Sequence, residues 1–255
     1  MNVKKHLFAL GLAAVMATPA MAADDILPPS ADSAFSITGN VALTTEYFFR
    51  GISQSNDSPA VSGGLNLNYK VVDWLTATAG IWSSSIDSGT GNGGVEVDYL
   101  LGVAIVPPML SDLTVNLGST WFTYPGTKNA GVEPDWWEGS LGATYNFGLF
   151  TLGGMYAYSP DFNLNSGTGH YINGKVVVPL GYVDLSGSVG KQYIEKNVAY
   201  GLKDYIDWKL AAGAKVWGLD LELAYIDTNV DQALPTGTTQ AATDGVFIFT
   251  VTKNF

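Results

Sequence analysis

The 255-residue chain contains no cysteine and few charged residues. Without cysteine it can form neither a disulfide framework nor a thiolate site. Charged residues make up 14% of the chain, well below the roughly 25% of an ordinary soluble domain. The hydrophobic share of 47% excludes intrinsic disorder. Beyond residues 1–22, no apolar run approaches the ~20 residues that a membrane helix needs. The composition therefore suits neither an ordinary soluble domain nor a helical membrane protein.

The N-terminus indicates export from the cytoplasm. Residues 1–22 read as a signal peptide, with two lysines, a short apolar stretch and the small-x-small sequence Ala20-Met21-Ala22. We expect cleavage after Ala22, followed by a short exposed tail over residues 23–33. Removing the two lysines leaves 10 basic and 23 acidic residues, a net charge of 10 − 23 = −13. An acidic exported protein is a poor candidate for nucleic-acid binding, so no nucleic-acid partner is expected.

Side chains alternate in character along the rest of the chain. Over residues 219–225, leucines and a tyrosine occupy every second position and face one side, as in a half-buried strand. Many such segments run for about 9–11 residues or more, the length that a tilted strand needs to cross a membrane. Twelve segments are expected, at roughly residues 34–50, 58–70, 74–84, 95–106, 113–124, 136–147, 150–158, 170–179, 182–191, 204–216, 219–227 and 246–255.

The connections between these segments alternate between short and long. Tight turns follow the even-numbered segments, and longer stretches rich in Gly, Ser, Asn, Thr and Asp follow the odd-numbered ones. Short periplasmic turns opposite long extracellular loops are typical of outer-membrane barrels. Residues 34–255 are therefore predicted to form one all-β domain, a transmembrane antiparallel up-and-down barrel of about twelve strands. Its apolar face would meet lipid and its polar face the lumen, so that few charges suffice.

Aromatic residues and the last strand agree with this prediction. Tyr and Trp near strand ends are expected to form girdles at the two membrane interfaces, although aromatic packing inside a soluble sandwich is the alternative. Phe247, Phe249, Val251 and Phe255 share one face of the final segment, interrupted by Lys253. Such a strand resembles the signal that the barrel-assembly machinery reads. The expected partners are therefore that machinery, outer-membrane lipid or lipopolysaccharide, and small solutes. The girdle candidates are Trp74, Trp82, Trp121, Trp136, Trp137, Phe147, Phe150, Tyr156, Tyr158, Tyr193, Tyr205, Trp208, Trp217 and Tyr225.

Strand parity also predicts which charged side chains face the lumen. Arg50, the only arginine, lies four residues from Glu46 on the first expected strand. It could anchor an anion or set a constriction, or it could pair with Glu46 or another luminal acid and brace the wall. Because acids outnumber bases in this set, any selectivity should weakly favour cations. The predicted pore-lining residues are Glu46, Arg50, Lys70, Glu96, Asp98, Glu138, Lys175, Asp184, Asp207, Lys209, Lys215, Asp220 and Glu222.

Catalytic chemistry has little support in the sequence. His170 is the only histidine after the signal peptide, and no Gly-x-Ser-x-Gly elbow is present. The stretch that begins at Asp161 is similar to a calcium loop, but its glycine comes one place late and position 12 is Ile172. It is interpreted as an Asx-rich turn. We expect no enzymatic activity, no metal site and no cofactor.

One stretch of the chain resembles a known family. The sequence Tyr47-Phe-Phe-Arg-Gly-Ile-Ser-Gln-Ser55 and the ending Lys253-Asn-Phe255 resemble the TorF-family porins of Gram-negative outer membranes. The resemblance implies a channel-like barrel and no catalytic residues. The expected function is a porin-like channel in the bacterial outer membrane for passive diffusion of small hydrophilic solutes or ions. The alternatives are a structural or adhesion barrel with a filled lumen, a barrel hydrolase, and a secreted soluble sandwich.

Overall fold

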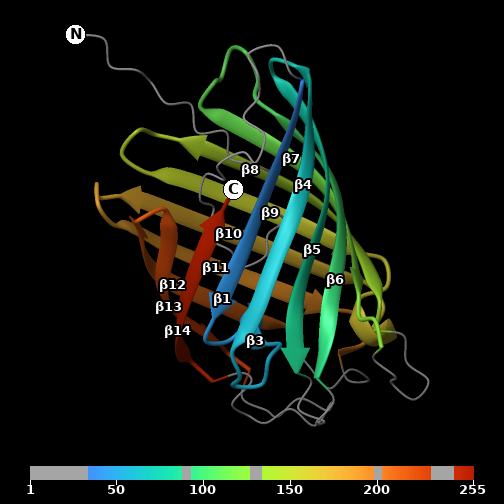
Figure 1. The fold of residues 1–255 in the computed structure, drawn as a ribbon. Coiled ribbons are helices and arrows are strands. Elements are labelled where there is room, and N and C mark those ends of the chain that lie inside the picture. The colour runs from blue at the N-terminus through green and yellow to red at the C-terminus, as the bar shows by residue number, and fades with distance from the viewer. Residues whose placement is uncertain (1–33, 88–92, 127–133, 198–202, 231–243) are drawn as a thin grey trace.

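Twelve antiparallel strands close into one barrel (Figure 1). The computed structural model describes residues 34–87, 93–126, 134–197, 203–230 and 244–255, so the expected signal peptide and tail lie outside the described residues. Each barrel strand pairs with its neighbour in sequence, and β1 closes the barrel against β14. The barrel strands are β1 (Phe35–Thr44), β4 (Ala60–Val72), β5 (Leu75–Asp87), β6 (Gly93–Ile105), β7 (Leu113–Thr123), β8 (Trp136–Asn146), β9 (Thr151–Ser159), β10 (Gly169–Pro179), β11 (Asp184–Ile194), β12 (Tyr205–Val216), β13 (Leu219–Thr228) and β14 (Val246–Asn254).

The predicted fold class is confirmed, and one predicted strand is wrong. Eleven of the twelve expected segments coincide with a barrel strand to within about three residues, inside the normal error of strand boundaries. The alternation in the sequence predicts a first strand over residues 34–50, but β1 ends at Thr44 and the chain then leaves the barrel wall. Glu46 and Arg50 therefore do not share a face of a wall strand.

The two ends of the barrel differ in their connections. At one end, here called the short-turn end, the strands are joined tightly, and β1 begins and β14 finishes there. Trp217 and Gly218 form the two-residue turn between β12 and β13, with φ angles of 52° and 75°. Two consecutive positive φ values are the geometry of a type I′ hairpin turn, whose twist matches that of the strands. The opposite end is called the long-loop end, and parts of its loops lie outside the described residues.

The two faces of the wall carry different side chains. Outward positions are mostly apolar and exposed, with Leu101 and Leu210 each 63% exposed. Inward positions of the same strands are mostly polar or small, as on β12, where Asp207, Lys209 and Gly213 oppose Ile206 and Leu210. An apolar exterior and a polar interior are the reverse of a soluble protein and are typical of a membrane-spanning barrel. Among the described residues, no helix has the length and apolarity needed to span a membrane.

Candidate functional site in the barrel lumen

Residues 45–59, between β1 and β4, form a small hairpin that the sequence did not predict. Its strands are β2 (Phe48–Phe49) and β3 (Ile52–Ser53), and Phe49 pairs with Ile52. Arg50 and Gly51 make the turn, with φ angles of 47° and 77°. These are again the two left-handed positions of a type I′ turn, where glycine is favoured and a side chain such as that of Arg50 is strained. We call residues 45–59 the luminal hairpin.

Apolar side chains seat the luminal hairpin against the inner wall on two sides. Phe48 is 2% exposed and packs on Ala211, Ala224, Ile226 and Ile248, which face inward from β12, β13 and β14. On the other side, Phe49 and Ile52 contact a second cluster. That cluster contains Phe122, Trp136, Phe162, Ile194 and Tyr205, and the rings of Phe122 and Trp136 stack with centroids 4.0 Å apart. The luminal hairpin therefore lies packed against the inner wall in the long-loop half of the lumen.

This packing corrects part of the predicted aromatic girdle. Trp136 and Tyr205 are buried inside the barrel, and the Trp82 ring lies 5.5 Å from the ring of Tyr47 on the luminal hairpin. These three aromatic residues lie near strand ends because the luminal hairpin packs against the inner wall there, and not because they meet the membrane interface. Several other candidates are exposed on the outside, as a girdle requires. They are Trp74, Trp121, Trp137, Phe147, Phe150, Tyr156, Tyr158 and Trp217.

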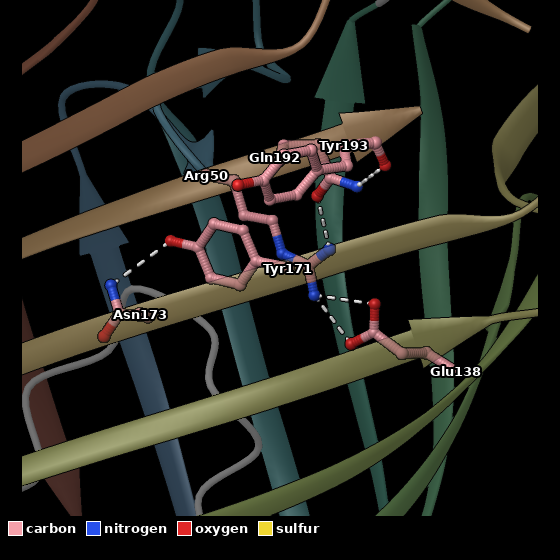
Figure 2. Close-up of polar contacts among 6 residues, drawn as sticks. All are labelled: Arg50, Glu138, Tyr171, Asn173, Gln192 and Tyr193. Carbon is pink, nitrogen blue, oxygen red and sulfur yellow. Dashed lines mark hydrogen bonds and ion pairs between the residues drawn. The ribbon is translucent and has the colours of Figure 1, made fainter. Parts of the chain in front are cut away.

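Arg50 joins the tip of the luminal hairpin to three strands of the opposite wall. Its Nη2 donates to both carboxylate oxygens of Glu138 on β8, at 2.6 and 2.7 Å, and its Nη1 donates to Oε1 of Gln192 on β11, at 2.8 Å. The guanidinium carbon lies 4.1 Å from the ring centroid of Tyr171 on β10. Figure 2 shows the guanidinium held between these side chains. The planar guanidinium can donate to Glu138 and Gln192 from two nitrogens while its face lies over the Tyr171 ring, a combination that suits arginine better than lysine.

The charge of Arg50 is fully compensated although the side chain is buried. Burial by itself lowers the pKa of Arg50, but the charge and hydrogen bonds of Glu138 outweigh it, so the pKa is raised above its ordinary value. Arg50 therefore stays protonated and Glu138 is its ion-pair partner. A buried pair of this kind is costly to break from one side, because the remaining charge has no partner.

Glu46 braces the luminal hairpin from within and does not pair with Arg50. Its carboxylate accepts hydrogen bonds from the Ser53 hydroxyl and from the backbone N–H of Asp57, the latter at 3.1 Å. Burial raises the pKa of Glu46, and these two hydrogen bonds partly offset the rise. The neighbouring Tyr47 hydroxyl donates to Oε1 of Glu96 on β6, at 3.2 Å. The hairpin is thus tied to the wall on the β6 side as well as through Arg50.

The remaining predicted pore-lining residues fall into three groups. Five acids are buried, and two of them, Glu96 and Asp98, lie near Tyr47. Asp207 accepts a hydrogen bond from the Tyr171 hydroxyl at 3.1 Å, and Asp220 accepts one from Asn254 Nδ2 at 2.6 Å. Glu222 forms an ion pair with Lys209 Nζ at 2.5 Å. Lys175, Asp184 and Lys209 are on inward positions and half-buried. Lys70 and Lys215 are exposed near the short-turn end, where Lys70 pairs with Asp73 of the turn at 2.7 Å.

The short-turn half of the lumen has a different lining. Many of its inward side chains are small or polar and remain partly exposed, although Thr78, Asp220, Thr252 and Asn254 in the same half are buried. Because an inward side chain can be exposed only toward the lumen, unfilled space remains in this half. Examples of the partly exposed side chains are Asn66, Asn68, Asn116, Thr144, Ser186 and Ser188.

The described residues do not form a catalytic site of a familiar kind. His170 lies on an outward position, where its Nδ1 is 2.7 Å from the Tyr156 hydroxyl on the outer surface. No group of three or more His, Asp or Glu side chains within the described ranges could hold a metal ion. Asp161 accepts a hydrogen bond from the backbone N–H of Gly167 at 3.1 Å, the contact expected of a turn.

Comparisons with solved structures identify the fold. The COG4313 outer membrane channel from Pseudomonas putida F1 is 12% identical, with a TM-score of 0.54 over 91% of this chain and 97% of that chain. A chain from a study of in-meso crystallization of membrane proteins is 8% identical, with a TM-score of 0.55 over 86% of this chain and 83% of that one. A refined porin structure is 11% identical, with a lower TM-score of 0.45 over 87% of this chain and 100% of that chain.

Sequence comparison places the chain in a family. No curated protein matches it significantly in sequence. One family model, described as a bacterial protein of unknown function (Gcw_chp), matches residues 29–255, which include the whole barrel and the luminal hairpin. The chain is therefore a member of the Gcw_chp family, with the barrel fold of outer-membrane channels.

Proposed function

We propose that the protein is an outer-membrane channel for passive diffusion of small hydrophilic solutes or ions, narrowed at its long-loop end by the luminal hairpin. The observation that carries the proposal is the lining of the short-turn half, where inward Asn, Thr and Ser side chains are reached by solvent. The similarity in fold to an outer membrane channel supports the same function.

The proposed location is the bacterial outer membrane. The exposed apolar belt on the outer face suits lipid, and closure of the sheet satisfies the backbone groups that lipid cannot. Export by a signal peptide over residues 1–22 and membership of the TorF-family porins belong to this proposal. So does recognition by the barrel-assembly machinery through the last strand, on which Phe247 and Phe249 are exposed. Lipid or lipopolysaccharide would then be the surrounding partner.

A structural or adhesion barrel with a filled lumen is the second candidate. The luminal hairpin favours it, because its apolar contacts and the Arg50–Glu138 pair hold it inside the barrel. The two candidates differ in whether a continuous wet path passes the hairpin. A barrel hydrolase has no support of this kind, since His170 is on the outer surface beside Tyr156. We therefore propose no enzymatic activity.

Conductance in planar lipid bilayers tests the proposal. Full-length protein purified in detergent should give discrete current steps, and Arg50→Ala should give larger steps, because the variant releases the hairpin tip from the wall. Lys191→Ala is a matched control, because it removes one positive charge from an exposed outward position of β11. Silence at every voltage in both the original protein and Arg50→Ala would contradict the channel and support the filled barrel.

A further inference from the structure

The structure distributes charge in the lumen differently from a simple count of acids and bases. Most inward acids either pair with a basic residue or are buried away from solvent. Glu138 is paired with Arg50 and Glu222 with Lys209, and Asp220 accepts a hydrogen bond from Asn254. The other buried acids lie around the luminal hairpin: Glu46, Glu96, Asp98 and Asp207. Of the inward acids on the described strands, Asp184 alone is half-exposed and without a hydrogen bond or ion pair.

Lys175, in contrast to the paired acids, is an inward charged residue without a partner among the described residues. It occupies an inward, half-buried position of β10, four residues from Tyr171 and toward the short-turn end. Within the described part of the chain, its Nζ has no hydrogen bond and no ion pair within 4 Å. The charged groups that act on it are those of Lys209 and Glu222. Lys215, also inward, is exposed near the short-turn end without an ion pair in the described ranges.

The strand register places Lys175 in a row with two other donors. Lys175 pairs with Ser188 of β11, and Ser188 pairs with Lys209 of β12. Adjacent strands are about 4.8 Å apart, so the two lysine Cα atoms are separated by about 10 Å, with a serine hydroxyl between them. Both lysine side chains are long enough to converge on one small group over that span. Lys209 also holds Glu222, which neutralises one of the two charges.

We infer that this row, formed by Lys175, Ser188 and Lys209, is a binding site for small anionic solutes that carry a carboxylate or phosphate group. Two ammonium groups and a hydroxyl offer the donors that such oxygens accept. The uncompensated Lys175 supplies the net positive charge. The inference rests on the proposed channel function, and it replaces the weak cation preference expected from the count of charges with a preference for anions.

The reversal potential across a bilayer in a potassium chloride gradient measures this preference. The unaltered protein should pass chloride in preference to potassium. Lys175→Gln should lower the chloride-to-potassium permeability ratio by about a factor of six, because one charge about 8 Å away in water changes the energies of chloride and potassium by a factor of about 2.4 each, in opposite directions. Lys175→Glu should invert the preference. The control Lys191→Gln removes a charge from the outward face of the adjacent strand, and should leave the ratio unchanged.

The outcomes separate this inference from the channel function. If the current steps are cation-selective, or if Lys175→Gln does not change their selectivity, the anion site is contradicted. The channel function is still supported in both cases. If the unaltered protein is silent, the same ratios are measured in the Arg50→Ala background. If neither the unaltered protein nor Arg50→Ala conducts, the channel function is contradicted. Calorimetric titration of the detergent-purified protein with inorganic phosphate then tests the anion site independently. Saturable heat that Lys175→Gln removes supports it, and no heat from the unaltered protein overturns it.

Discussion

The two halves of the lumen are built from the same strands and yet have opposite linings. In the long-loop half, inward side chains such as Gln192 and Asp98 are completely buried, and apolar residues such as Ile226 and Ile248 point inward. In the short-turn half, inward side chains such as Asn116 and Ser186 remain partly exposed. The difference is the luminal hairpin. Strand parity decides which side chains face inward, but the height along the barrel decides whether they contact the luminal hairpin.

The largest expected effect comes from removing the hairpin's anchor. Arg50→Ala should lower the free energy of unfolding by about 3–5 kcal/mol, because it leaves the Glu138 carboxylate buried without its partner. Urea unfolding in detergent micelles, followed by tryptophan fluorescence, measures this change. The double variant Arg50→Ala/Glu138→Ala should recover part of the loss, since no unpaired charge remains. A loss below about 1 kcal/mol for Arg50→Ala would show that the hairpin is not anchored as described.

A smaller effect is expected at the hairpin turn. Gly51 has a positive φ, and a Cβ there would lie 2.8 Å from Cβ of Asp207 and still closer to Thr228. Gly148, in the short turn after β8, also has a positive φ, but a Cβ added at this position would have no other atom within 4 Å. Gly148→Ala should therefore cost only the backbone strain, about 1 kcal/mol. Gly51→Ala should cost about 1–3 kcal/mol more, from overpacking.

The same urea unfolding experiment compares the two glycine variants. Equal losses would mean that the turn at Gly51 does not touch the wall, which would contradict the docked position of the luminal hairpin. A larger loss for Gly148→Ala would contradict it as well.

The smallest expected effect lies in the loops at the long-loop end. Glu195 accepts hydrogen bonds from the backbone N–H and the hydroxyl of Thr168, and these lower the pKa of Glu195 below its ordinary value. A depressed folded-state pKa means that the contact contributes stability above the ordinary pKa and loses it as pH falls through the lowered value. Thr168→Ala should move the pKa of Glu195 upward. Carboxyl NMR shifts measured against pH would show this, and an unchanged titration would contradict the contact.

The barrel itself could be predicted from the sequence because each strand carries its own signal. Alternation over 9–11 residues and the alternating lengths of the connections depend only on local sequence. The same period of two predicts that the side chains of Lys175, Asp207 and Glu222 point into the lumen. Their partners could not be predicted, because pairs such as Glu222 with Lys209 join different strands at a height that depends on the register.

The luminal hairpin escapes prediction for a physical reason. Glu46 and Arg50 keep the parity of the inward Thr44, and no glycine or proline lies between Thr44 and Gly51, so the pattern extends the strand past Thr44. A local signal is present in Arg50-Gly51, since a glycine that ends a two-residue turn between short apolar pairs is typical of a tight hairpin. The inward direction of the hairpin depends on distant residues, including Ile248 and Trp136, and no local pattern contains that information.

The most direct test of the account is the reactivity of single cysteines, which the cysteine-free chain allows. Ser186→Cys places a thiol in the short-turn half, and Ala224→Cys places one beneath Phe48 of the luminal hairpin. With a small water-soluble thiol reagent, the folded barrel should react rapidly at residue 186 and slowly at residue 224, and Arg50→Ala should speed the reaction at residue 224. Equal, rapid reaction at both positions in the barrel with Arg50 intact would contradict a luminal hairpin packed on the wall at one end and a lumen open to solvent at the other.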